Sequence, residues 1–210
     1  MSETYHITSH CTIRNGVFNS SHPIDRLKVP SEELGSWLLE AYNTLGGNYP
    51  KFHKMDTLCK LGFIASEIVL KPVLVQNLYE KKDIAVILAN SVSSLDSDLN
   101  YVKTISDPEN YFPSPVVFVY TLPNIVIGEI CIRNKFMGEN AFFISEKFDA
   151  ALFVQNAETL LDGNFAKACL VGWVDVLEGY YEASSYFVEK ADTFSNFDLN
   201  IANLNNLYRP

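Results

Sequence analysis

Three short, mainly apolar runs constrain the fold of this chain more than any other feature. They cover residues 83–89 (Asp-Ile-Ala-Val-Ile-Leu-Ala), 140–144 and 166–171, and each is followed by polar residues or glycine. Strands that are buried on both faces of a parallel sheet have this pattern. Residues 150–161, between the last two runs, carry apolar side chains at helical spacing. A strand, a helix and a strand in this order predict a right-handed βαβ unit and an α/β fold.

Further elements are predicted on the N-terminal side of these runs. Residues 5–13 are rich in β-branched side chains and favour an opening strand. A helix over residues 34–45 follows Ser31, which is an N-cap candidate. A second amphipathic helix begins near Asp56, and Pro72 should end it because proline lacks a backbone N–H. Both helices should pack on the sheet.

Composition and charge exclude several classes of protein. Hydrophobic residues make up 48% of the 210 residues, so the chain can bury a core and is not disordered. The net charge of -9 argues against nucleic-acid and membrane-surface partners, which bind clustered Lys and Arg. The longest apolar segment, 116–132, is interrupted by Pro123 and Glu129 and is too short to span a membrane. The first residues do not resemble a signal peptide, so we expect a cytoplasmic protein.

Cysteine, histidine and aspartate residues give no sign of a metal or redox site. The cysteines are scattered without a Cys-x-x-Cys motif, which predicts buried thiols rather than disulfides or a zinc site. Three aspartates near residues 96–107 more closely fit a capped and solvated helix over residues 96–105 than a calcium loop. We therefore predict no metal and no cofactor. The residues concerned are Cys11, Cys59, Cys131, Cys169, His6, His10, His22, His53, Asp96, Asp98 and Asp107.

Five motifs, taken in order and spacing over roughly residues 5–178, resemble the β-ketoacyl-ACP synthases. They are Lys54-Met55-Asp56 before a helix, the polar turn at 90–94, Phe112-Pro113-Ser114-Pro115 with Tyr120-Thr121-Leu122-Pro123-Asn124, Gly138-Glu139-Asn140-Ala141, and Asp162-Gly163 with Leu170-Val171-Gly172-Trp173-Val174-Asp175. The resemblance implies half of a thiolase-like fold, with a five-stranded mixed sheet and helices on both faces. Residues 1–210 would form a single domain like the N-terminal half of these synthases, with residues 180–210 as a C-terminal arm.

The resemblance also bears on residues 116–122. Their composition alone favours a strand that Pro123 would end. In the synthases, two successive short helices occupy this stretch. The resemblance therefore implies a helix here, with Pro123 in the first turn of the next helix.

The same resemblance places a degenerate active-site turn at Ser145, Glu146 and Lys147. The synthases carry a cysteine at this turn, where a helix N-terminus lowers the thiol pKa and allows the thiolate to accept an acyl group. Counting forward from Gly138 places Lys147 at that position, whereas counting back from Gly163 places Glu146 there. The turn could be an ordinary helix start with Ser145 as N-cap, or a pseudo-active site. A nucleophilic Ser145 would need an adjacent base, and none is visible.

The resemblance, together with the missing cysteine, implies a catalytically incompetent synthase-like subunit that supports a fatty-acid, polyketide or aryl-polyene type pathway. The synthases' catalytic histidine pair lies in a second half of the fold, and the four histidines here all fall in the first quarter. The alternative is a true acyl-transfer or condensing enzyme of the 3-oxoacyl-ACP synthase type, completed by a partner chain. We expect a homodimer or a heterodimer with a full-length synthase, formed through an apolar helical layer at residues 120–132. Binding to acidic carrier protein should be weak because both proteins are acidic.

Overall fold

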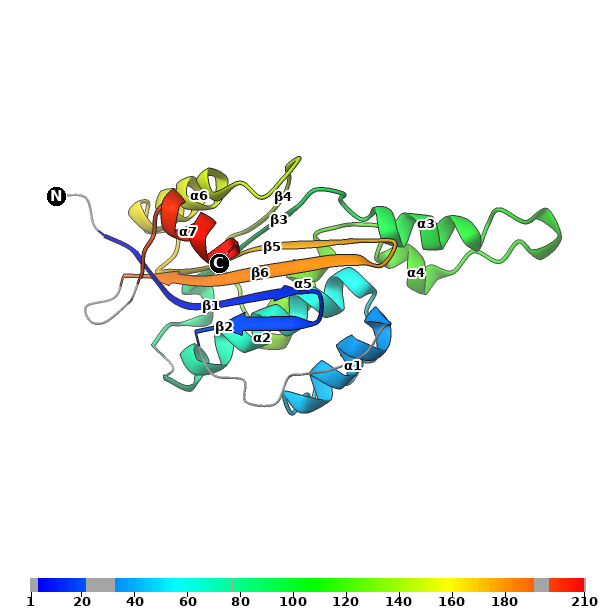
Figure 1. The fold of residues 1–210 in the computed structure, drawn as a ribbon, viewed down its shortest axis with the longest axis horizontal. Helices are drawn as coiled ribbons and strands as arrows, with labels where there is room; N and C mark the ends of the chain where they lie inside the picture. Colours follow the sequence, from blue (N-terminus) through cyan, green and yellow to red (C-terminus); the bar gives the residue numbers. More distant parts are fainter. Residues whose placement is uncertain (1–3, 22–32, 77, 191–196, 210) are drawn as a thin grey trace.

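A mixed β-sheet forms the centre of the structure (Figure 1). The computed structural model describes residues 4–21, 33–76, 78–190 and 197–209. The strands are β1 (His6–Arg14), β2 (Val17–Ser20), β3 (Ile84–Asn90), β4 (Asn140–Ile144), β5 (Ala168–Leu177), β6 (Tyr180–Glu189) and β7 (Phe197–Asp198). Their order is β2-β1-β6-β5-β3-β4, with β7 also paired to β1. β3 runs parallel to β4 and β5, whereas β6 is antiparallel to both of its neighbours.

Helices cover both faces of this sheet, as predicted. On one face lie α1 (Leu34–Thr44), α2 (Thr57–Gln76) and α5 (Ile125–Asn134), and on the other lie α6 (Ala150–Asp162) and α7 (Ile201–Tyr208) (Figure 1). α3 (Leu95–Lys103) and α4 (Pro115–Val119) project beyond the end of the sheet (Figure 1). Short 3-10 helices are η1 (Pro50–Lys54), η2 (Lys81–Asp83) and η3 (Pro108–Asn110). The strand count differs from the expected five because the short strands β2 and β7 add to β1.

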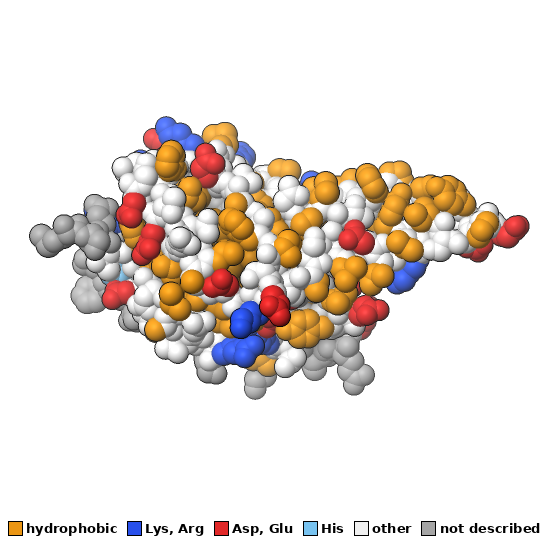
Figure 2. All heavy atoms as spheres, turned by 90° about the horizontal axis from the view of Figure 1, so that it is seen from above, with side chains coloured by type: hydrophobic (Ala, Val, Ile, Leu, Met, Phe, Trp, Pro, Cys, Tyr) orange, Lys and Arg blue, Asp and Glu red, His pale blue; other side chains and the backbone are white. Residues whose placement is uncertain are grey.

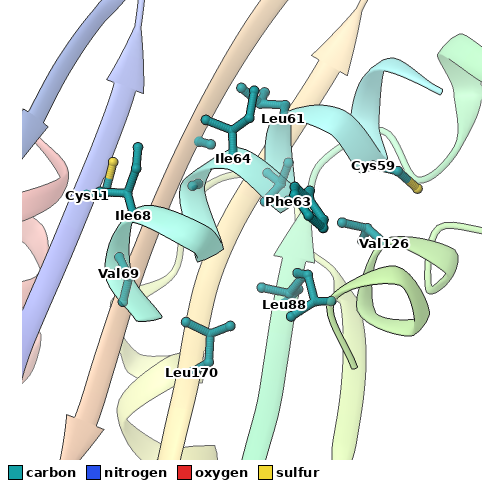
Figure 3. Close-up of a cluster of buried hydrophobic side chains, with 14 of the residues drawn as sticks. Cys11, Cys59, Leu61, Phe63, Ile64, Ile68, Val69, Leu88, Val126 and Leu170 are labelled. Atoms are coloured by element: carbon teal, nitrogen blue, oxygen red, sulfur yellow. The ribbon is translucent and has the colours of Figure 1, made fainter. Parts of the chain in front are cut away.

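Two hydrophobic cores lie on opposite faces of the sheet. In the first, Leu61 and Ile64 of α2 pack with Leu88 of β3 and Val126 of α5 (Figure 3). The second contains Phe153 of α6 together with side chains of β3, β5, β6 and α7. Alternate residues of β3 belong to alternate cores, and every residue of this strand is buried. The prediction of a parallel strand buried on both faces is therefore confirmed.

Two predicted element ends were wrong. α2 continues through Pro72 to Gln76, because Val69 and Val73 on either side of the proline are buried in the core. β5 continues through Gly172 instead of ending there. A Cβ at Gly172 would lie 2.7 Å from the carbonyl oxygen of Ser184 on β6, so glycine permits the close approach of these two strands.

Residues 116–122 are helical in their first part, so the strand interpretation was wrong. Pro115 occupies the first turn of α4, and the Ser114 side chain accepts a hydrogen bond from the Val117 amide at 3.4 Å. Pro123 precedes Asn124, the N-cap of α5, instead of lying in the first turn of that helix. The predicted N-cap Ser31 lies outside the described residues.

The expected apolar layer at residues 120–132 is mostly buried, and only Leu122 and Ile132 among its large hydrophobic side chains are exposed. α5 packs against α2, and Val126, Ile127 and Ile130 are buried there. The expected C-terminal arm also differs, because its first ten residues form β6, an interior strand paired with β1 and β5. Within the described residues, no helix combines the length and the apolarity that crossing a membrane requires.

Candidate functional site

The carboxyl ends of the parallel strands β3, β4 and β5 carry the polar residues of the candidate site. Ser145, Glu146 and Lys147 follow β4 directly, and the Ser145 amide donates a hydrogen bond to the Asn90 carbonyl at 2.9 Å. Glu146 and Lys147 are exposed. All three line an open pocket of about 440 Å³, and Glu146 and Lys147 also line a neighbouring pocket of about 460 Å³.

The helix after this turn is capped by a residue that the sequence analysis did not consider. α6 begins at Ala150, and the Asp149 carboxylate accepts hydrogen bonds from the amides of Ala151 (2.9 Å) and Leu152 (3.3 Å). Ser145 is therefore not the N-cap, and Glu146 and Lys147 precede the helix. Asp149 has two effects on a nucleophile in this turn. It occupies the amides that could stabilise an anion, and it adds a negative charge.

The turn after β3 is joined to β5 by a second carboxylate. Asp175 is buried and accepts hydrogen bonds from the Ser91 hydroxyl and from the Ser91 amide (3.3 Å). The Asn90 side chain is also buried and bridges the amide and carbonyl of Ser93, whose φ of 56° is left-handed. The hydrogen bonds between Ser91 and Asp175 thus join two residues that line the larger pocket.

Glu182 of β6 is the centre of the polar network at the back of this pocket. Its Oε1 accepts hydrogen bonds from Trp173 Nε1 (2.9 Å) and from the Tyr208 hydroxyl, and its Oε2 lies 2.8 Å from Arg14 Nε. Burial, followed by the hydrogen bond to Glu182, raises the pKa of Tyr208 to about 12. In this network, one buried carboxylate therefore binds both a neutral tyrosine and an arginine.

The C-terminal helix α7 is tied to this network and to the turn after β4. Its last carbonyls accept hydrogen bonds from β1, Leu207 from the Thr12 hydroxyl at 3.1 Å and Tyr208 from the Arg14 guanidinium. The Phe148 ring stacks on the Tyr208 ring with centroids 3.8 Å apart. Phe148 thus connects the turn after β4 to α7, and both rings line the larger pocket.

None of the four thiols of the chain is activated as a nucleophile. Burial raises the pKa of the Cys169 thiol to about 12, and it also raises the pKa of Cys11, Cys59 and the half-buried Cys131. Because the thiolate is the reactive form, these shifts disfavour acyl transfer at any of the four. None of them lines either pocket.

The histidines and aspartates that the sequence analysis considered as candidates lie away from the pockets or stabilise local structure. His6 and His10 are in β1 and His53 is in η1, whereas His22 lies outside the described residues. Asp107 caps η3 by accepting a hydrogen bond from the Glu109 amide at 3.0 Å. Asp96 and Asp98 lie in the first turn of α3, but no side chain caps this helix, so the expected capping role was wrong. Among the described residues, no group of three or more His, Cys, Asp and Glu is placed to hold a metal ion.

Arg14, Asp149, Glu182 and Tyr208 were not identified as site residues from the sequence. Glu182 and Tyr208 lie in the stretch interpreted as an arm, and Arg14 comes just after the predicted strand. One signal was available for Asp149, because an aspartate directly before an apolar helical repeat is a standard N-cap pattern.

Comparison with known proteins establishes the fold. No family model matches the chain, and no curated protein matches it. Among solved structures, the ishigamide ketosynthase/chain length factor aligns with a TM-score of 0.63 and 16% identity, over 91% of this chain and 63% of that one. A type II PKS acyl-carrier protein in complex with its ketosynthase bound to the hexaketide aligns with a TM-score of 0.65 and 12% identity. This alignment covers 90% of this chain and 62% of that one. The chain thus spans about three fifths of these two proteins.

In a third match, the alignment covers a larger share of the matched protein. A ketosynthase in complex with its chain length factor from Xenorhabdus doucetiae aligns with a TM-score of 0.57 and 14% identity. The alignment covers 90% of this chain and 79% of that one, so the matched protein is shorter than the first two. Together with the sheet order and the helices on both faces, these likenesses establish that the chain has a ketosynthase-like fold, corresponding to one half of the thiolase fold.

Proposed function

We propose that this chain is a non-catalytic ketosynthase-like subunit that pairs with an active synthase in a fatty-acid, polyketide or aryl-polyene type pathway. In this proposal residues 1–210 form one domain, and Ser145, Glu146 and Lys147 occupy a degenerate active-site turn. The observation that carries the proposal is the start of α6. No thiol stands in the turn before it, and Asp149 already accepts hydrogen bonds from the first amides of the helix.

Two further observations support the proposal that this chain has no catalytic activity of its own. An acyl-transfer nucleophile needs a neighbouring base or a lowered pKa. Burial raises the pKa of all four thiols, and neither pocket is lined by a histidine. A structural match to a ketosynthase in complex with its chain length factor supports a partner chain of the ketosynthase type.

Measurement of the intact mass directly tests whether this chain accepts an acyl group. The isolated chain is incubated with acyl- and malonyl-carrier protein, and its mass is then determined. We expect no acyl adduct, and only weak binding of the carrier protein because the chain carries a net charge of -9. Stoichiometric acylation that Ser145→Ala or Cys169→Ala abolishes would favour the alternative, a condensing enzyme completed by a partner.

A further inference from the structure

Residues 95–122, which comprise α3, η3 and α4, form a helical arm that extends beyond the carboxyl end of β3 (Figure 1). This helical arm carries nine of the eighteen large hydrophobic side chains that are exposed among the described residues. They are Leu95, Leu99, Val102, Tyr111, Phe112, Val116, Phe118, Val119 and Leu122. Figure 2 shows hydrophobic side chains gathered along this projecting end of the molecule. Half of the exposed hydrophobic side chains are thus concentrated on one small part of the surface.

The exposed apolar area is large enough for a specific interface. Phe112 is 79% exposed, Tyr111 62% and Val116 61%. Taking aromatic side chains at about 150–250 Å² and aliphatic ones somewhat smaller, the nine side chains expose on the order of 900 Å². A standard interface buries about 800 Å² per partner, whereas the largest apolar patch of a typical monomer is about 300–600 Å².

The helical arm is held in this conformation by contacts that leave most of these side chains facing outward. The Tyr101 and Phe118 rings pack α3 against α4 with centroids 5.3 Å apart. The Phe112 amide donates a hydrogen bond to the Thr104 carbonyl at 2.9 Å, which fixes the return of the chain. The Ser94 hydroxyl donates to the Thr121 carbonyl at 2.8 Å and closes the base of the arm. The exposed side chains are therefore presented by an ordered scaffold.

Charge identifies the kind of partner that fits. The helical arm contains Asp96, Asp98, Asp107 and Glu109 against the single cation Lys103. A second copy would bring the same acidic residues to the interface, and each copy carries a net charge of -9. Like charges placed together at an interface oppose association, whereas Lys and Arg around an apolar groove would favour it.

We infer that the helical arm is the docking surface for a different chain, a full-length ketosynthase with an apolar groove flanked by Lys or Arg, and not for a second copy of this chain. The identity of the partner rests on the proposed function. The location of the surface rests only on the exposure, order and charge of the arm.

The test compares two double variants in binding to a full-length ketosynthase that is co-expressed with this chain. Phe112→Ser with Val116→Ser changes two of the most exposed side chains of the helical arm. Ile132→Ser with Met137→Ser is the matched control. These residues are 60% and 76% exposed, and the Met137 amide bonds to Lys81 near the start of β3, at the opposite end of that strand from the arm. Calorimetry measures affinity at low and high salt, and sedimentation measures the oligomeric state of each chain alone.

We expect the arm variant to bind at least about 30-fold more weakly, the control to bind like the wild type, and added salt to weaken binding. Equal binding by all three proteins would support the proposed function and overturn the arm as the surface. An absence of binding by the wild type would overturn the partner and the proposed function together. A wild-type homodimer that the arm variant dissociates would overturn the inference that a second copy is excluded.

Discussion

Glu182 shows how one residue can organise the candidate site. Its carboxylate joins side chains from three other elements, Trp173 of β5, Arg14 of β1 and Tyr208 of α7. The carboxylate is largely removed from water, so each of these donors offsets part of its desolvation cost. Its loss would leave the Arg14 charge without its carboxylate and the indole N–H without its acceptor.

We therefore predict that Glu182→Gln lowers the free energy of unfolding by about 3 kcal/mol, the magnitude typical of breaking a buried ion pair. Glu158→Gln, at an exposed position of α6, is the control and should change it by less than about 0.5 kcal/mol. Urea denaturation of both variants measures the difference. Equal stability of the two variants would show that Glu182 does not hold these elements together.

At the scale of elements, the approach of β5 to β6 depends on Gly172. A Cβ added there would lie 2.7 Å from the Ser184 carbonyl oxygen and 3.2 Å from a Leu88 methyl group. Both neighbours are in the sheet or its core and cannot move away freely. Gly128 in α5 provides the opposite case, because a Cβ there meets nothing within 4 Å.

We predict that Gly172→Ala destabilises the protein by about 2 kcal/mol through overpacking, and that Gly128→Ala stabilises it by up to about 1 kcal/mol through helix propensity. Thermal unfolding of the two variants checks the sign of each effect. A stabilising Gly172→Ala would mean that β5 and β6 are not paired as closely as described here.

Elements with strong periodicity were predictable, and those decided by tertiary packing were not. The buried run at 83–89 and the helix at 150–161 match β3 and α6 because their patterns reflect burial directly. The helix through Pro72 could not be predicted, since core contacts of its neighbours offset a local cost that proline carries in any sequence. For residues 116–122, the resemblance predicted the helix that composition missed, although α4 ends at Val119, because β-branched side chains are compatible with a short capped helix.

The candidate site was predictable only in part. The position of the turn at Ser145 to Lys147, directly after β4, could be predicted from the resemblance to the synthases, and its role as a degenerate active-site turn stays a proposal. Its link to Glu182 and Tyr208 could not, because it depends on β6 being an interior strand and on α7 folding back over β1. Contacts between residues so distant in sequence leave no periodic signal.

At the scale of the whole molecule, helices cover both faces of the sheet, whereas the helical arm extends beyond one end of it (Figure 1). α1, α2 and α5 cover one face, and α6 and α7 cover the other, where Leu204 and Leu207 of α7 complete the second core (Figure 1). Among the described residues, half of the exposed large hydrophobic side chains lie on the helical arm, which is where our account places the partner.

The most direct test of the central claim, that this chain assists a synthase without supplying catalytic groups, is the condensation rate of the assembled complex. The rate is measured with wild-type chain, with the variant Ser145→Ala/Glu146→Ala/Lys147→Ala, and with wild-type chain bound to a ketosynthase whose own nucleophilic cysteine is replaced by alanine. Our account predicts that the triple variant keeps the wild-type rate within about twofold and that the loss of the partner's cysteine abolishes it. A triple variant that still forms the complex but loses condensation as completely as the cysteine variant would contradict the account.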